Sequence, residues 1–230
     1  MSANAQYWKE YWKKRSQVKG ELVASGWGDR DIKEYLYDLS DISKKLELKS
    51  SDSLLNIGCG NGLMEIVLSS WIKKISSVDF SPGMVRRAKI NNKRNNRTIF
   101  FNGSILDLSF LKKQDYDKIL CNSVMQYLSG ADEIVQAFKE IKKVSKKESK
   151  ILISANPDES RMDEFLSGYD KLSFTNKEKK TKKEINKLSL WTKPAEIKNI
   201  ASRLGFKAKI LKMDSNIWQS WYMYDLLMWR

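Results

Sequence analysis

Short apolar segments alternate with longer segments of helical periodicity through the middle of the chain. Residues 53–57 form a first apolar segment, with Ser and Asp before it and Gly after it, which predicts a buried strand. The same pattern predicts further elements, namely strands over 75–79, 98–101, 118–121 and 150–154 and helices over 63–71, 82–92 and 131–144. Strands that alternate with helices predict βαβ units and a mainly parallel sheet.

The N-terminal part carries two more helical patterns. Four aromatic residues stand at positions i, i+1, i+4 and i+5 of one helical stripe: Tyr7, Trp8, Tyr11 and Trp12. A second pattern, with apolar residues three or four positions apart, covers 29–47. We expect residues 1–48 to form an N-terminal helical cap or lid and residues 49–230 to form the main domain.

Residues 157–190 break the alternation, because they are polar and carry no clear period. Within them, 171–187 holds seven Lys against two Glu. We interpret the stretch as a basic insertion, formed either as a loop or as an addition on the substrate side of the domain. After it, the pattern predicts a helix over 194–204 and a closing pair of strands over 206–212 and 220–229.

The composition narrows the chemistry. The 230 residues include no histidine, which excludes Ser-His-Asp and Cys-His catalysis and His-ligated metal sites, and no metal site is predicted. Two cysteines make no disulfide framework, so a reducing compartment, the cytoplasm, is expected. No apolar run reaches about 18 residues, and the N-terminal segment lacks the apolar core of a signal peptide. Neither a membrane span nor a signal peptide is therefore expected.

The charge balance leaves two interpretations open. Lys and Arg number 42 against 28 Asp and Glu, which gives a formal net charge of +14. Such a charge fits contact with nucleic acid or another anionic partner. It also fits a lysine-rich surface in water with no such partner, and composition alone favours this second interpretation.

The most informative segment is a glycine turn between a predicted strand and a predicted helix, Gly58-Cys59-Gly60-Asn61-Gly62. Glycines let a backbone approach a ligand closely, and the following helix offers free N–H groups. The spacing G-x-G-x-G differs from the dinucleotide motif G-x-G-x-x-G, and no G-K-[ST] follows it. Asp79 ends the next strand, 21 residues after Gly58, where a carboxylate can accept hydrogen bonds from both hydroxyls of a ribose.

Four segments together resemble the class I S-adenosylmethionine-dependent methyltransferases. They are LLNIGCGNG (54–62), VDFSPGMVRRA (78–88), FNGSILDLSF (101–110) and YDKILCNSVMQYL (116–128). The resemblance implies a Rossmann-like α/β fold with a seven-stranded, mainly parallel sheet, helices on both faces and a terminal antiparallel hairpin. It also implies S-adenosyl-L-methionine as the cofactor and an enzyme that transfers its methyl group.

The resemblance further implies roles for cofactor-binding residues. The glycine turn would line the methionine part of the cofactor, Asp79 would hold the ribose, and Asn56 occupies a position where the family often has an acid. The implied cofactor contacts are Asn56, Gly58, Cys59, Gly60, Asp79, Phe80, Met84, Ser104, Ile105, Asn122 and Ser123. Of these, Phe80, Met84, Ser104 and Ile105 would lie near the adenine, and Asn122 and Ser123 beside the methionine amine and the transferred methyl group.

The stretch after the fourth predicted strand faces the methyl acceptor in the family. Gln126 and Tyr127 are therefore the preferred substrate contacts, and with Asp158 they are the candidate catalytic residues. Aromatic residues of the N-terminal segment, above all Tyr7, Tyr11 and Trp12, could cover cofactor and substrate as a lid. The alternative is a helix that packs its aromatic stripe on the core.

The acceptor itself stays open between three interpretations. The first is an O or N atom of a small metabolite, with a sugar or an anionic biosynthetic intermediate as examples. The second is an RNA or a protein bound through the basic surface. Nucleic acid is not favoured, since the motif Asn/Asp-Pro-Pro-Tyr/Phe of exocyclic-amine methyltransferases is absent after the fourth strand. The third is a non-catalytic scaffold that binds the cofactor. The sequence does not determine the oligomeric state.

Overall fold

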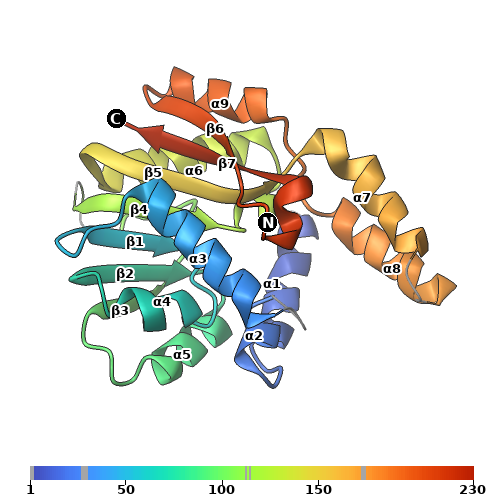
Figure 1. Cartoon of the computed structure of the whole chain (residues 1–230), viewed down its shortest axis with the longest axis horizontal. Helices are drawn as coiled ribbons and strands as arrows, with labels where there is room; N and C mark the ends of the chain where they lie inside the picture. Colours follow the sequence, from blue (N-terminus) through green and yellow to red (C-terminus); the bar gives the residue numbers. More distant parts are fainter. Residues whose placement is uncertain (1–2, 27–30, 112, 114, 172–174) are drawn as a thin grey trace.

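A seven-stranded sheet forms the centre of the computed structural model, which describes residues 3–26, 31–111, 113, 115–171 and 175–230 (Figure 1). The strand order is β3-β2-β1-β4-β5-β7-β6. The strands are β1 (Ser53–Ile57), β2 (Lys74–Asp79), β3 (Thr98–Asn102), β4 (Tyr116–Asn122), β5 (Ser145–Pro157), β6 (Lys207–Lys212) and β7 (Met223–Trp229). The strands from β3 to β5 run parallel, and β7 pairs antiparallel with both β5 and β6. The predicted fold class is confirmed.

Nine α-helices surround the sheet in the described part of the chain. They are α1 (Ala3–Arg15), α2 (Glu21–Ala24), α3 (Ile32–Leu46), α4 (Leu63–Leu68), α5 (Pro82–Asn91), α6 (Ala131–Val144), α7 (Met162–Gly168), α8 (Asn176–Lys187) and α9 (Pro194–Arg203). Four 3-10 turns complete the described elements, η1 (Met125–Tyr127), η2 (Glu159–Arg161), η3 (Tyr169–Lys171) and η4 (Trp218–Trp221). The start predicted for α3 at residue 29 lies outside the described residues.

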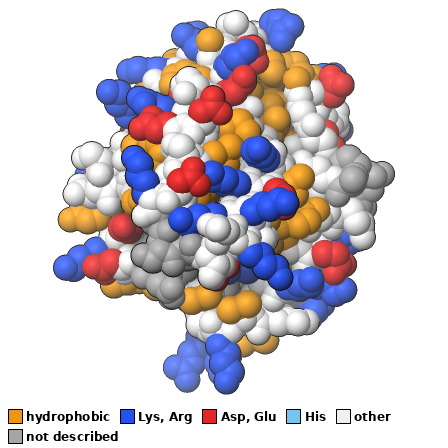
Figure 2. All heavy atoms as spheres, turned by 90° about the vertical axis from the view of Figure 1, so that its right-hand side faces the viewer, with side chains coloured by type: hydrophobic (Ala, Val, Ile, Leu, Met, Phe, Trp, Pro, Cys, Tyr) orange, Lys and Arg blue, Asp and Glu red, His pale blue; other side chains and the backbone are white. Residues whose placement is uncertain are grey.

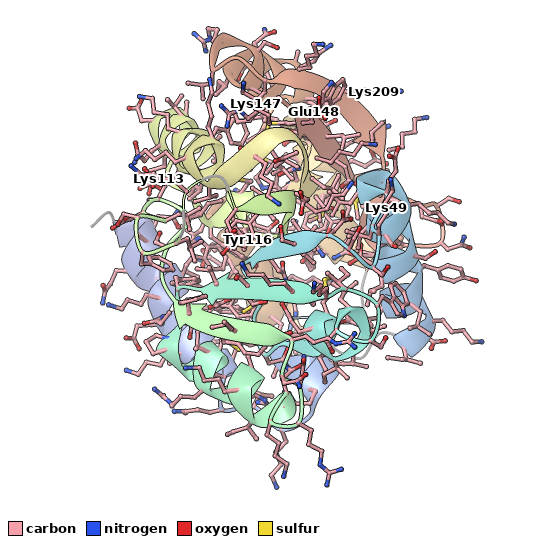
Figure 3. The ribbon with its side chains drawn as sticks, turned by 90° about the vertical axis from the view of Figure 1, so that its left-hand side faces the viewer. Lys49, Lys113, Tyr116, Lys147, Glu148 and Lys209 are labelled. Carbon is pink, nitrogen blue, oxygen red and sulfur yellow. The ribbon has the colours of Figure 1, made fainter. Side chains whose placement is uncertain are left out.

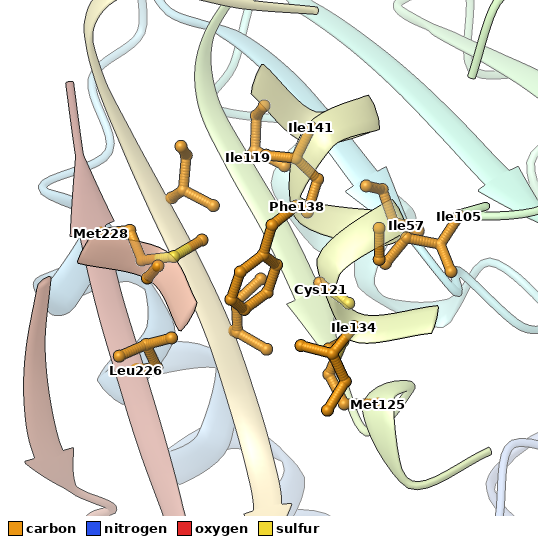
Figure 4. Packing of buried hydrophobic residues seen from close by; sticks show 14 of the residues in the cluster. Ile57, Ile105, Ile119, Cys121, Met125, Ile134, Phe138, Ile141, Leu226 and Met228 are labelled. Atoms are coloured by element: carbon orange, nitrogen blue, oxygen red, sulfur yellow. The ribbon is translucent and has the colours of Figure 1, made fainter. Parts of the chain in front are cut away.

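Both faces of the sheet are covered, because each central strand supplies apolar side chains to two cores. Leu54 belongs to the core beneath α3 and α4, whereas Leu55 and Ile57 belong to the core beneath α6 and α9. Successive strand residues point to opposite faces, which explains this division. Phe138 of α6 is fully buried in the second core, among side chains of the sheet such as Met228 (Figure 4).

Local signals set the helix that follows β2. Ser81 is the N-cap of α5, since its Oγ accepts a hydrogen bond from the Met84 N–H at 3.4 Å, and Pro82 occupies the first turn. A short polar side chain followed by proline is the expected start of a helix. The cap directs the chain away from the sheet immediately after Asp79, so that this carboxylate remains at the carboxyl edge.

The basic stretch 157–190 is helical over much of its described length, so of its two interpretations the loop is wrong. Helices α7 and α8 project from the body of the molecule beyond the carboxyl ends of the strands (Figure 1). Thr175 and Glu178 form a capping box that starts α8. No residue of α8 is buried, so the helix carries no apolar face by which a hydrophobic period could reveal it. Residues 172–174 of the predicted insertion lie outside the described residues.

The amino ends of the parallel strands form the opposite end of the molecule (Figure 3). Lys49, which precedes β1, and Lys147, near the start of β5, are exposed at this end, where β4 also starts at Tyr116. Part of the positive charge therefore lies far from the carboxyl edge of the sheet. At this amino end, exposed lysines are stabilised by water and need no anionic partner. Of the described helices, none is both long and apolar enough to cross a bilayer.

Candidate functional site

A cavity of about 280 Å³ opens over the carboxyl ends of β1, β2 and β4. In open α/β sheets this edge is where ligands bind. One half of the cavity is bounded by the glycine turn after β1 and by Asp79 and Asn122, at the ends of β2 and β4. The other half is bounded by residues from α8, from the segment after it and from η4 and β7. The cavity thus joins the strand edge to the inserted helices.

Two glycines of the turn serve different purposes. Gly58 has φ +78°, and a Cβ added to it would stand 2.1 Å from Cγ2 of Val124. Gly60 has φ +55°, and a Cβ added there would meet no atom within 4 Å. Gly58 is therefore required by packing within the protein, whereas the open space at Gly60 belongs to the cavity and fits a ligand that lies against the backbone.

The third glycine explains the unusual spacing of the motif. A Cβ on Gly62 would lie 2.9 Å from Cβ of Ala88, on α5. Helix α4 begins directly after Gly62, so the glycine lets the start of α4 pack closely against α5. In the dinucleotide motif the third glycine also serves close packing of the helix. Here that contact is made with a neighbouring helix, one position earlier.

Asp79 is held rigidly at the cavity. Its Oδ2 accepts a hydrogen bond from the Gly60 N–H at 2.9 Å, and its Oδ1 accepts one from the Ser81 N–H at 2.8 Å. Burial raises the pKa of this carboxyl group to about 6, against the lowering effect of both backbone donors. At neutral pH the group is mainly ionised, and each oxygen keeps a further lone pair. The arrangement fits the two hydroxyls of a ribose.

Asn56, where the family often has an acid, is backed by an acid from another element. Glu65 of α4 accepts hydrogen bonds at Oε1 from the Asn56 amide at 2.7 Å and from the Ser77 hydroxyl at 2.6 Å. The Glu65 side chain is fully buried, and burial raises its pKa. The signal in the sequence was a lone Glu within the apolar segment LMEIVL, which could have been identified as a buried, paired carboxyl group.

The short helix α2 is fastened to the glycine turn. Its Glu21 accepts hydrogen bonds from Arg87 Nη2 at 2.7 Å and from the Asn61 amide at 2.7 Å. A bidentate contact between a guanidinium and a carboxylate is among the stronger polar contacts. The N-terminal segment is thereby tied both to α5 and to the turn that borders the cavity.

The structure brings most of the predicted cofactor residues into the cavity wall: Asn56, Gly58, Cys59, Gly60, Asp79, Phe80, Asn122 and Ser123. Three others lie outside it. Met84 and Ile105 are buried in the core, and the Ser104 Oγ accepts a hydrogen bond from the Leu106 N–H at 3.2 Å. Contact of these three with an adenine stays a prediction.

Of the three predicted catalytic residues, Gln126 and Tyr127 line the cavity. The phenol of Tyr127 accepts a hydrogen bond from the Gln126 amide at 3.1 Å. Burial raises the Tyr127 pKa well above the ordinary value, so the group stays protonated at neutral pH and a role as general base is not supported. The ring of Tyr127 packs instead against Trp8 and Trp12 of α1, with centroids 4.7 and 5.6 Å apart.

The remaining predicted residues divide between the wall and the surface. Trp12 lines the cavity, whereas Tyr7 and Tyr11 stack on each other outside the wall, with ring centroids 6.4 Å apart. Asp158 is not in the wall either. Asp158 is the N-cap of η2, because its carboxylate accepts hydrogen bonds from the N–H and the hydroxyl of Ser160. The structure gives Asp158 a capping role, and its catalytic role stays a prediction.

Sequence reasoning missed residues that reach the cavity from distant elements. In the half at the strand ends, which we call the cofactor half, they are Tyr35, Asn61, Leu63, Met64 and Val124. In the other half, which we call the acceptor half, they are Pro157, Asn186, Ser189, Trp191, Gln219, Tyr222 and Met223. Ser25 and Gly26, after α2, line the cavity as well. Most of the second group come from the basic insertion and from the closing hairpin. Their proximity depends on how these segments pack together, which no local pattern encodes. The aromatic residues near 191 and 222 were the available signal.

Comparisons with known proteins agree with this geometry. A family model described as a methyltransferase domain matches residues 55–153. An uncharacterised methyltransferase of Schizosaccharomyces pombe is 30% identical over 88 residues, which cover 38% of this chain and 33% of that protein. The chain spans between a third and just over half the length of the curated relatives it matches.

Solved structures share the fold over the whole domain. A S-adenosylmethionine-dependent methyltransferase from Aquifex aeolicus has a TM-score of 0.63 at 16% identity, over 91% of this chain and 98% of that chain. Magnesium protoporphyrin IX methyltransferase from Synechocystis PCC 6803, solved with bound S-adenosylmethionine, has a TM-score of 0.65 at 14% identity, over 100% of this chain and 98% of that chain. Residues 55–153 therefore match a methyltransferase domain, and the chain has the fold of solved S-adenosylmethionine-dependent methyltransferases.

Proposed function

We propose that this chain methylates an O or N atom of a small, uncharged acceptor that carries a flat, apolar part. The observation that carries the proposal is the composition of the acceptor half of the cavity. Four aromatic residues border it, from α1, η1, the segment after α8 and the end of η4: Trp12, Tyr127, Trp191 and Tyr222. Polar groups there are neutral amides and a hydroxyl, namely Gln126, Asn186, Gln219 and Ser189.

The charge of the wall argues against an anionic acceptor. Among the described residues that line the cavity, none is Lys or Arg, and Asp79 is the one carboxylate. A buried anion without a cationic partner is costly. We therefore favour a neutral acceptor over the anionic intermediate that the net charge suggested, and an aromatic acceptor over a sugar.

The aromatic wall is held firmly enough to orient a flat acceptor. Trp191 Nε1 donates a hydrogen bond to the Asn186 carbonyl at 3.0 Å, and the Tyr222 ring lies 6.1 Å from the Trp191 ring and 4.5 Å from that of Phe165. Aromatic faces at these separations stabilise one another. Fixed rings restrict the acceptor to few orientations, which is the main task of the protein in a direct transfer.

Few described residues of the cavity wall could act as a general base for the acceptor. Bound S-adenosylmethionine supplies an electrophilic methyl group on its sulfonium. Asp79 is committed to the turn and the ribose, the Tyr127 phenol stays protonated, and burial raises the pKa of the Cys59 thiol. The described part of the wall therefore positions the acceptor and offers no strong base. This favours an amine or an acidic hydroxyl, which can release its proton to water.

A labelled-methyl assay tests the proposal. The chain is incubated with S-adenosylmethionine carrying a labelled methyl group and with matched sets of neutral aromatic amines, phenols, neutral sugars and anionic aromatic acids. We expect label in the amines or phenols and little in the sugars and acids. Exclusive labelling of anionic compounds would overturn the choice of a neutral acceptor. Cofactor binding without transfer to any set or to fractionated cell extract would indicate a scaffold.

One observation favours a second candidate, an RNA or protein that carries the acceptor. Lys177, Lys180 and Lys187 of α8 are exposed, and this helix also supplies Asn186 to the cavity. Figure 2 shows this side of the molecule, with Lys and Arg side chains among exposed hydrophobic ones. Phosphate contacts would make binding fall steeply with salt. A steep loss of RNA affinity between low and physiological salt would support this candidate, and undetectable RNA binding at low salt would exclude RNA.

Tyr127 offers a prediction about the wall once an acceptor is identified. Tyr127→Phe should change kcat by less than about threefold, with an unchanged pH profile, because its phenol stays protonated. Tyr127→Ala removes the ring that contacts Trp8 and Trp12, and should raise the KM of the acceptor at least about tenfold. Steady-state rates between pH 6 and 9 measure both. A tenfold lower kcat in Tyr127→Phe would give the hydroxyl a direct role.

A further inference from the structure

A buried carboxylate that the sequence gave no reason to select lies directly behind the cavity wall. Asp38 belongs to α3, in the N-terminal part of the chain, and only 2% of its surface is exposed. The Asn122 side-chain amide donates a hydrogen bond to Asp38 Oδ2 at 3.0 Å. Asn122 lines the cavity at the end of β4. The pair thus connects an N-terminal helix to the cofactor half of the site.

Within the described part of the chain, no cation is paired with Asp38 alone. From the same helix, Lys45 donates hydrogen bonds to Asp225 Oδ2 of β7 at 2.6 Å, to the Lys212 carbonyl at 2.7 Å, and to Asp41. The lysine is therefore committed to other acceptors. Among the described residues, Asn122 is the hydrogen-bond donor that the structure gives to Asp38.

The other groups near Asp38 are acids or neutral. Asp225 is satisfied separately, since its Oδ1 accepts hydrogen bonds from the Ser154 hydroxyl at 2.8 Å and the Ala155 N–H at 2.9 Å. Tyr35 of the same helix interacts electrostatically with Asp38 and with Glu65 of α4. A buried carboxylate among acids is stabilised by a positive charge that enters from outside. The cavity is the route by which a ligand can supply it.

The hydrogen bond to Asp38 determines which atom of Asn122 is available to a ligand. An ionised carboxylate only accepts hydrogen bonds, so the NH₂ group of the amide must face it. The carbonyl oxygen Oδ1 of Asn122 is then not engaged by Asp38. It accepts a long hydrogen bond from the Ser123 hydroxyl, at 3.5 Å, and keeps a further lone pair for the cavity. Asn122 lies on the opposite side of β1 from Asp79, since β1 pairs with β2 on one edge and with β4 on the other. A cofactor whose ribose is held by Asp79 can therefore extend across the glycine turn to this oxygen.

We propose that Asp38 is a positioning residue for the methionine end of the cofactor. It orients Asn122 so that Oδ1 accepts a hydrogen bond from the cofactor ammonium, and its own charge stabilises that ammonium through the amide. The inference rests on the proposed binding of S-adenosylmethionine. It assigns to α3, outside the motifs of the domain, a part in recognising the amino-acid end of the cofactor.

The titration of Asp38 supports this assignment. Burial, followed by the charge of Asp225, raises its pKa to about 7, while the Asn122 hydrogen bond lowers it; Asp41 raises it and Lys45 lowers it. Below that pH the protonated acid can donate a hydrogen bond, and the Asn122 amide is free to reverse. Ligands with an ammonium should therefore bind more tightly as the pH rises from 6 to 7.5, a range below the ordinary α-amino pKa of about 8.

Calorimetry with two ligands tests the proposal on the whole chain. S-Adenosylhomocysteine carries the ammonium, and 5′-methylthioadenosine has the same adenosine and sulfur but no amino-acid end. Asp38→Asn should weaken the binding of S-adenosylhomocysteine about tenfold and leave the affinity for methylthioadenosine unchanged within about twofold. It should also reduce the gain in S-adenosylhomocysteine affinity between pH 6 and 7.5. Both ligands depend on Asp79. The change in methylthioadenosine affinity with pH therefore measures the effect of Asp79, and the additional change for S-adenosylhomocysteine is assigned to Asp38.

Control variants separate positioning from folding. Asp41→Asn, on the same helix, should leave the affinities of both ligands unchanged within about twofold. Asn122→Ala should weaken S-adenosylhomocysteine selectively, and adding Asp38→Asn to it should cause no further loss, since the two residues act as one unit. Equal weakening of both ligands by Asp38→Asn, or unchanged S-adenosylhomocysteine affinity, would overturn the proposal. If the unaltered chain binds neither ligand, the cofactor assignment itself fails.

Discussion

Replacing Asp79 with alanine should weaken S-adenosylhomocysteine binding by about a hundredfold or more. Hydrogen bonds to a charged group contribute about 1.5–3 kcal/mol each, and two ribose hydroxyls would lose them together. The variant also removes the acceptor of the Gly60 and Ser81 N–H groups, so the turn loses a constraint on its shape. Titration calorimetry of the variant and the unaltered chain measures the ratio.

The control for this prediction is an acid in the next loop along the same edge. Asp107 is exposed, and its carboxylate accepts a hydrogen bond from the Ser109 N–H at 3.0 Å. Asp107→Ala should leave cofactor affinity unchanged within about twofold. An Asp79→Ala variant that folds and binds as tightly as Asp107→Ala would show that Asp79 does not hold the ribose.

The pH dependence of binding gives an independent check on Asp79. Its pKa is raised by burial to about 6, above the ordinary value for an aspartate. Because the ionised form accepts both hydroxyls, affinity should be complete well above pH 6 and should fall toward tenfold per pH unit as the pH drops below it. Methylthioadenosine is the ligand of choice, because it lacks the ammonium that responds to Asp38. A flat affinity between pH 5 and 7 would contradict the role of Asp79.

The cofactor half of the site could be predicted because its signals are local. The strand, the glycine turn and the acid at the end of the next strand follow one another within a short segment, and the Ser81 cap marks where α5 begins. Each feature is produced by backbone geometry that depends on neighbouring residues in sequence. The positions of Gly58, Gly60 and Asp79 around one cavity follow directly from that order.

The acceptor half could not be predicted because its residues converge through packing. Trp191 and Tyr222 reach one wall only after the basic insertion folds into two helices and the closing hairpin returns to β5. Asp38 and Glu65 were missed for a related reason. Each lies on a helix that packs on the sheet, and its effect is transmitted through an asparagine that sequence reasoning did select.

The largest effect on stability should come from Gly58→Ala. The new Cβ would stand 2.1 Å from Val124 Cγ2, and the backbone there has φ +78°. Overpacking costs about 1–3 kcal/mol, and a left-handed conformation costs a residue with a Cβ about 1–2 kcal/mol. We therefore expect the free energy of unfolding to fall by about 2–5 kcal/mol. Urea denaturation of the variant and the unaltered chain measures it, and Val124→Ala added to Gly58→Ala should recover the overpacking part.

Gly60→Ala tests cofactor binding separately from folding stability. Its backbone is also left-handed, with φ +55°, but the new Cβ would meet no protein atom within 4 Å. The loss of stability should therefore be limited to the conformational cost, about 1–2 kcal/mol, while the methyl group occupies space against which the cofactor would lie. Cofactor affinity should fall at least about tenfold in a variant that is still folded. Unchanged affinity in Gly60→Ala would mean that the cofactor does not bind in the open space beside this glycine, because a methyl group placed in the cofactor's own space would weaken its binding.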